Sequence, residues 1–115
     1  MSIVRIAPGS RMSGAVVHGD TVYLAGHVST EPAGNVRGQT EAILRRIDVR
    51  LAEAGTDRSK LLSATIWLAD IATFDEMNAA WDAWVDPANP PARATVEARL
   101  ASPEYLVEIA VIAAR

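Results

Sequence analysis

The stretch QTEAILRRIDVRLAEAGTDRSKLLSATIWL (residues 39–68) joins a predicted helix to a predicted central strand. Over residues 39–54, apolar side chains recur at the 3.6-residue spacing of one helix face: Ile43, Leu44, Ile47 and Leu51. Gly55 follows as the residue that ends the helix in a left-handed conformation. Residues 61–68 are rich in strand formers and predict a central strand.

The residues before this stretch predict a β-hairpin and a loop. Residues 15–17 and 21–24 are short apolar runs that flank a Gly19-Asp20 pair, which suits a tight turn with positive φ. Gly26 closes the second strand. Residues 29–38 contain a proline, two glycines and an asparagine, so they predict a loop.

The residues after it predict a second helix and two further strands. Thr73 and Glu76 have the spacing of a capping box, which marks a helix start. Pro87 begins a proline-rich segment that ends this helix and forces an extended chain. Residues 92–100 and 106–114 then predict the last two strands.

The predicted element order is β-β-α-β-α-β-β, which describes a single α+β domain over residues 1–115. Two helices of this length cover one face of a mixed sheet and give a two-layer domain. The other face of the sheet then needs a partner or a polar surface. We therefore expect copies of the chain to associate through their sheets.

Charge and composition narrow the classes of function. The formal net charge is −3, whereas nucleic-acid binders usually present a basic face, so a nucleic-acid role is disfavoured. The local basic cluster of Arg45, Arg46 and Arg50 is interpreted as the solvated face of a helix. There are no cysteines, and the two histidines lack a ligand-like spacing, so no metal site is predicted.

Neither a leader nor a membrane span is expected. Residues 1–10 lack the basic region and the long apolar core of a signal peptide. The apolar stretch of residues 106–114 is interrupted by Glu108 and is too short to cross a bilayer. A cytoplasmic location is the expectation.

Glu108 stands inside a strand that otherwise has the composition of a buried one. Because strand side chains alternate, it shares its face with Leu106, Ala110 and Ile112. A buried carboxylate must find a cation, raise its pKa or face water in a cleft. Two interpretations stay open: a structural ion pair or edge position, and a functional site.

Arg93 is the natural counterpart of Glu108. It follows Pro90-Pro91-Ala92, which holds its backbone extended, and its planar fork of donors matches a carboxylate. Recognition of a small acid and a structural salt bridge are both open. Asn78 has poor propensity for its mid-helix position, so it either bonds a neighbouring backbone group or belongs to the site.

Six segments of the sequence form a recognisable ordered set: VYLAGHVS (22–29), GQT (38–40), LAEAGTDRSKLLSATIWLAD (51–70), FDEMNAAWDAWV (74–85), PPARATVEARL (90–100) and VEIAVIAA (107–114). Together they resemble the RidA/YjgF family, also called RutC-like, of reactive-intermediate deaminases. Each segment alone is weak evidence. The ordered set covers nearly the whole chain, and P-x-R-x-x-V followed by V-E-I is specific.

The resemblance implies a chorismate-mutase-like fold and a cofactor-free homotrimer with small-molecule clefts between adjacent subunits. It implies hydrolytic deamination of small enamines or imines, such as 2-aminoacrylate, to 2-keto acids and ammonia. Arg93 corresponds to the arginine that grips the substrate carboxylate, and Glu108 to the glutamate that orients or activates water. Asn78 and Gly26 correspond to residues of the cleft.

The cleft departs from the family pattern at four places. Arg11 or Met12 stands in the region of an N-terminal tyrosine, and Ala25 replaces a serine. His27 replaces a glutamine, and Thr95 replaces a cysteine. This pattern is nearer to the YoaB-like branch, and an Arg11 that reaches the cleft favours a more acidic or larger substrate. The alternative function is a non-catalytic module that binds small carboxylates.

Overall fold

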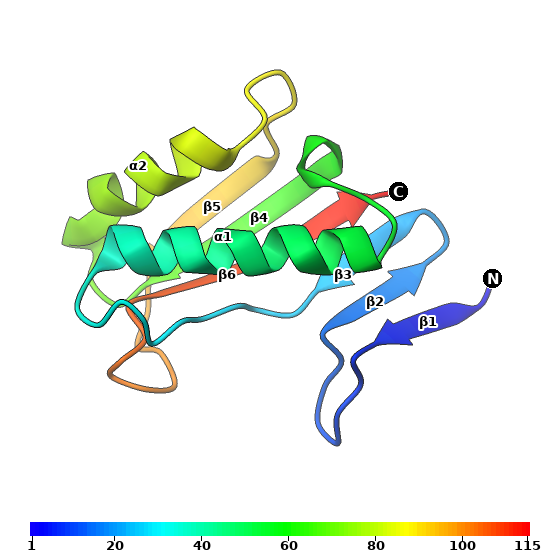
Figure 1. Ribbon diagram of the computed structural model, residues 1–115, viewed down its shortest axis with the longest axis horizontal. Coiled ribbons are helices and arrows are strands. Elements are labelled where there is room, and N and C mark those ends of the chain that lie inside the picture. Colours follow the sequence, from blue (N-terminus) through cyan, green and yellow to red (C-terminus); the bar gives the residue numbers. More distant parts are fainter.

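The computed structural model forms one six-stranded sheet with two α-helices (Figure 1). The strands are β1 (Ile3–Ile6), β2 (Ala15–His18), β3 (Thr21–Leu24), β4 (Leu61–Leu68), β5 (Ala92–Glu97) and β6 (Val107–Ala114). The helices are α1 (Val36–Glu53) and α2 (Phe74–Trp84). Short 3₁₀ turns, Arg58–Lys60 and Ile71–Thr73, precede β4 and α2.

The strands are ordered β1-β2-β3-β6-β4-β5, and only β4 and β5 run parallel. Both helices lie on the same face of the sheet, and they leave the opposite face uncovered (Figure 1). The predicted two-layer α+β class is therefore confirmed. Positive φ angles at Gly19 (62°) and Gly55 (82°) confirm the predicted hairpin turn and the predicted end of α1.

The hydrophobic core lies between the sheet and the two helices. Alternate residues of β6 are buried beneath the helices: Val107, Ile109, Val111 and Ala113. The residues between them, Glu108 among them, are half-buried on the open face. The period-two pattern that the sequence shows in this strand thus separates a core side from a side available for other contacts.

The chain has one strand more than the predicted order. Ile3 and Val4 of β1 are about half exposed, so β1 lacks the buried alternation that reveals a strand in a sequence. The last two strands appear where predicted, although β5 is shorter than the predicted range 92–100. It ends at Glu97 because β4, its partner, ends at Leu68 directly opposite.

α1 begins at Val36, earlier than the predicted start at Gln39. The side chain of Asn35 caps the helix, because its Oδ1 accepts a hydrogen bond from the backbone N–H of Gly38 at 2.8 Å. The prediction of a loop through residue 38 is therefore wrong for its last three residues. Asn35 and Gly38 therefore belong to the start of α1, as its cap and as a residue of its first turn.

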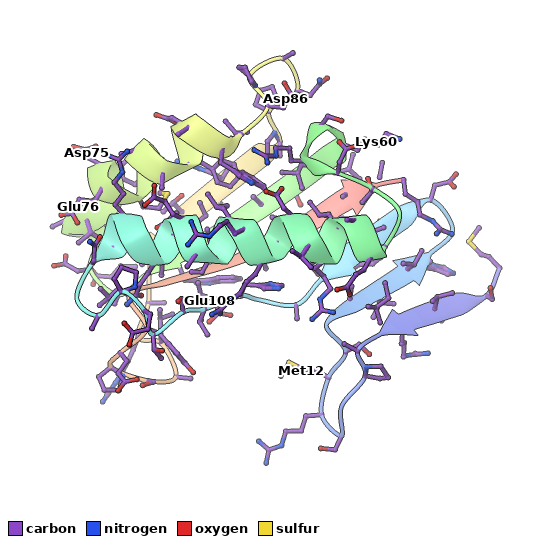
Figure 2. All side chains as sticks on the ribbon, viewed as in Figure 1. Met12, Lys60, Asp75, Glu76, Asp86 and Glu108 are labelled. Atoms are coloured by element: carbon purple, nitrogen blue, oxygen red, sulfur yellow. The ribbon has the colours of Figure 1, made fainter.

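The capping box predicted at the start of α2 is wrong. The hydroxyl of Thr73 donates to the carbonyl of Asp70 at 2.6 Å and caps no N–H group of the helix. Asp70 instead caps the preceding 3₁₀ turn by accepting from the N–H of Ala72 at 2.9 Å. Asp75 and Glu76 lie in the first turn of α2, where negative charge suits the helix dipole (Figure 2).

Candidate functional site

Arg93 lies on the edge strand β5, on the face of the sheet that the helices cover. Its partner in β4, Ala64, is buried on that face. The guanidinium carbon lies 5.7 Å from the ring centre of Phe74 and 5.3 Å from that of Trp81. Its Nη1 donates to Oδ1 of Asn78 at 2.8 Å. We call Arg93 with Phe74, Asn78 and Trp81 the arginine cage.

The arginine cage leaves the charge of Arg93 without a carboxylate partner. The two ion pairs of the chain join Arg50 to Glu53 and Arg58 to Asp48, so the structural salt bridge considered for Arg93 is absent. Partial burial lowers the pKa of Arg93 from its usual value. The guanidinium stays protonated at physiological pH because the usual pKa of arginine lies far above neutral pH. The cage therefore presents an unneutralised cation.

Glu108 lies on the opposite face of the sheet, on β6 (Figure 2). It pairs with Trp67 of β4, is half-buried, and has no hydrogen bond or ion pair within the chain. Gly26 lies directly against it, since a Cβ at position 26 would overlap the carboxylate. A side chain at this position would push the carboxylate of Glu108 aside, so glycine leaves the carboxylate where it lies.

A single chain does not bring Arg93 and Glu108 together. Arg93 is opposite Ala64 and Glu108 is opposite Trp67, an odd number of residues apart on β4. Residues at odd spacing along a strand point to opposite faces, so the sheet separates the two charges. A pocket that contains both groups must draw them from two different copies of the chain.

Comparison with known proteins identifies the family. The family model described as Endoribonuclease L-PSP matches residues 2–115. A RutC family protein of Haemophilus ducreyi is 45% identical over 97% of this chain and 96% of its own length. RutC family protein YoaB of Escherichia coli is 44% identical over 99% of both chains. The chain belongs to the YjgF/RutC family.

A solved structure of the YjgF/RutC family carries the same fold. NMB1025 of Neisseria meningitidis, a member of the YjgF protein family, superposes with a TM-score of 0.96 and 43% sequence identity. The superposition covers 100% of this chain and 96% of that one. The fold agrees with the chorismate-mutase-like arrangement that the resemblance implies.

The remaining candidate residues of this YjgF/RutC chain occupy separate places. Thr95 faces the same side of β5 as Arg93, and its hydroxyl oxygen is buried without a hydrogen-bond partner. Ala25 is half-buried, and its N–H donates to the carbonyl of Gly14 at 3.0 Å. Arg11 is exposed in the loop between β1 and β2. Figure 2 shows the neighbouring Met12 on this projecting loop.

Two residues of the arginine cage are missed by the sequence interpretation. The site residues predicted from the sequence do not include Phe74 and Trp81, yet the rings of both flank the guanidinium. A signal was present, because Phe74, Asn78 and Trp81 stand at i, i+4 and i+7 and so share one helix face. No group of three metal-ligating side chains is found, and no helix is both long and apolar enough to cross a membrane.

Proposed function

We propose that the chain hydrolyses small enamines or imines that carry a carboxylate, such as 2-aminoacrylate, to 2-keto acids and ammonia. The observation that supports this most is the arginine cage, because it fixes a guanidinium that no carboxylate of the chain neutralises. Arg93 binds the substrate carboxylate through charge-assisted hydrogen bonds. Asn78 holds one end of the guanidinium and so orients its remaining donors.

Glu108 supplies the proton transfers of the proposed reaction. Its carboxylate orients a water molecule and accepts a proton as the oxygen adds to the carbon of the C=N bond. The proton passes to the nitrogen and gives a carbinolamine. Glu108 then moves the hydroxyl proton of this intermediate to the same nitrogen, so the C–N bond breaks and ammonia leaves as the C=O bond forms. Imine hydrolysis is intrinsically easy, so positioning of substrate and water supplies much of the acceleration.

The proposed site forms between adjacent copies in a homotrimer, as the family resemblance implies. Arg93 of one copy would face Glu108 and Gly26 of the next. The open face of the sheet supports association, because Tyr23 and Val96 are 45% and 46% exposed there and pair with Ile112 and Trp67 on the same face. Exposed apolar area of this kind favours burial against a partner.

The experiment couples an amino acid oxidase, which generates imines, to a measurement of imine loss. Wild-type protein is expected to accelerate the loss, and Arg93→Ala and Glu108→Gln are expected to abolish the acceleration. Arg37→Ala is the matched control, because Arg37 is an exposed arginine of α1 without a hydrogen-bond partner. Acceleration that persists in both site variants would refute the proposal.

A carboxylate-binding module without turnover is the second candidate. Binding requires only the arginine cage, which one chain assembles completely, whereas hydrolysis also requires Glu108. Stabilisation by pyruvate that depends on Arg93, without any loss of imine, would select this candidate. The matching family model names an endoribonuclease, and RNA cleavage by the purified protein that disappears in Glu108→Gln would replace both candidates.

A further inference from the structure

A basic groove lies along α1, away from the arginine cage and from Glu108. It encloses about 460 Å³ and is lined mainly by α1 together with one residue of the segment that follows β3. Its polar lining residues are His27, Arg45, Arg46, Arg50 and Glu53. We call these five residues with the space between them the α1 groove. Its three arginines lie on an accessible helix face, as the sequence predicts, since Arg45 and Arg46 are exposed.

The α1 groove carries a surplus of positive charge. Glu53 neutralises Arg50 in an ion pair of 2.8 Å, which leaves the charges of Arg45 and Arg46 uncompensated. Arg46 is held in place because its Nη1 donates to the carbonyl of Val28 at 2.7 Å. Arg45 has no hydrogen bond or ion pair with the rest of the chain. Two guanidinium groups without a carboxylate partner therefore line this groove, in a protein whose net charge is −3.

Backbone contacts fix the position of His27 at the rim. Its N–H and carbonyl both bond to Ile109 of β6, at 2.8 and 3.1 Å, and its Nδ1 lies 2.9 Å from the carbonyl of Ala25. Nδ1 therefore donates, which leaves Nε2 free to gain a proton. Glu108, beside Ile109, points to the opposite face of the sheet, so the charges facing His27 are those of α1.

Arg50 reaches the groove because the neighbouring loop has no side chain at Gly14. A Cβ at that position would lie 2.8 Å from the guanidinium carbon of Arg50, which is closer than real contacts allow. The loop between β1 and β2 thus packs against the guanidinium of Arg50, while the lining itself comes from α1 and His27.

We propose that the α1 groove binds a small ligand through a phosphoryl group. Guanidinium forks match the tetrahedral oxygens of a phosphoryl group, and two unpaired forks suit its two negative charges. The imidazole of His27 can donate a further hydrogen bond when it is protonated. The site is separate from the proposed imine site, so either can exist without the other.

The two histidines of the chain make the binding measurable by NMR titration. Burial and the charges of Arg50 and Arg46 lower the pKa of His27. A bound pyrophosphate reverses the local field and is expected to raise the pKa of His27 by about half a unit or more. The exposed His18, at the end of β2 and outside the groove, supplies reference resonances in the same spectrum. Sodium chloride at equal ionic strength controls for screening.

A pair of matched variants tests the residue assignment. Arg45→Gln removes a charge without breaking any contact of the fold and is expected to weaken pyrophosphate binding by about tenfold. Arg37→Gln, the same change at an exposed position elsewhere on α1, is expected to bind like wild type. The assignment is overturned by equal affinities for wild type and Arg45→Gln. It is also overturned if chloride raises the pKa of His27 as much as pyrophosphate does.

Discussion

The arginine cage and the surroundings of Glu108 differ in how far one chain completes them. Around Arg93, α2 supplies two aromatic rings and an amide that restrict the guanidinium. Around Glu108, the chain supplies only the space left by Gly26 and no polar partner. The chain thus prebuilds the binding half of the proposed site. The half that would handle water stays open on the face where another copy is expected to sit.

The largest expected effect is at the cage. Arg93→Ala removes the cation and should lower kcat/KM for a carboxylate imine by roughly 100-fold or more, as expected for the loss of charge-assisted hydrogen bonds. Arg93→Lys keeps the charge but loses the planar fork, and it should recover only part of the activity. Initial rates in the coupled imine assay measure both. Unchanged activity in Arg93→Ala would remove the functional difference between the two regions.

A change at Gly26 tests the Glu108 half of the proposed site without replacing Glu108 itself. Gly26→Ala places a methyl group against the carboxylate, so kcat should fall by roughly tenfold or more through misplacement. Gly9→Ala is the matched control, because a Cβ there meets only ordinary contact at 3.5 Å and its rate should not change. Thermal unfolding of both variants separates misplacement from loss of fold. Equal rates for Gly26→Ala and wild type would show that Glu108 needs no fixed position.

Loss of one cage ring should have a smaller effect. Phe74 is 38% exposed, so Phe74→Leu perturbs the core little while removing one aromatic face from Arg93. We expect KM to rise about threefold with kcat nearly unchanged, the size of an exposed cation–π contact. Steady-state kinetics measures KM and kcat separately for Phe74→Leu and wild type. A fall in kcat with constant KM would mean that the cage acts on the chemical step.

We expect the free energy of unfolding to depend on pH through His27, which lies outside both halves of the proposed site. Burial, with smaller contributions from Arg50 and Arg46, lowers the pKa of His27 below the 6.5 of the unfolded chain. Below pH 6.5 the unfolded state therefore binds more protons, and the free energy of unfolding decreases as the pH falls. His27→Gln should flatten this part of the stability curve. Urea unfolding between pH 5 and 8 measures this small effect.

Sequence patterns predicted most of the fold because most elements bury one regular face. The alternation in β6 and the 3.6-residue stripe of α1 both mark the core side, and both appear as predicted. β1 was not predicted because its side chains are mostly exposed at the sheet edge, so no buried alternation marks it in the sequence. The capping box failed because the Thr73 hydroxyl donates back to the carbonyl of Asp70 and accepts from no N–H group of α2.

The candidate site was predictable in its members but not in its geometry. Arg93, Glu108 and Asn78 each carry a local anomaly that a sequence reveals: a rigid approach, a charge in a buried strand, and a poor helix former. The relative faces of Arg93 and Glu108 depend on the register of β5 and β6 against β4. A shift of one residue would reverse them, and no local pattern fixes that register. The opposite faces of Arg93 and Glu108 therefore emerge only from the structure, whereas the family resemblance had already implied clefts between subunits.

Subunit mixing tests the division of the site between two copies most directly. Arg93→Ala and Glu108→Gln proteins, each inactive alone, are unfolded, mixed in equal amounts and refolded together. If each site takes its arginine and its glutamate from different copies, about a quarter of wild-type imine hydrolysis returns, because random assembly in a closed ring makes one interface in four intact. A mixture as inactive as its components, with mixed oligomers confirmed by native mass spectrometry, would contradict the two-copy site.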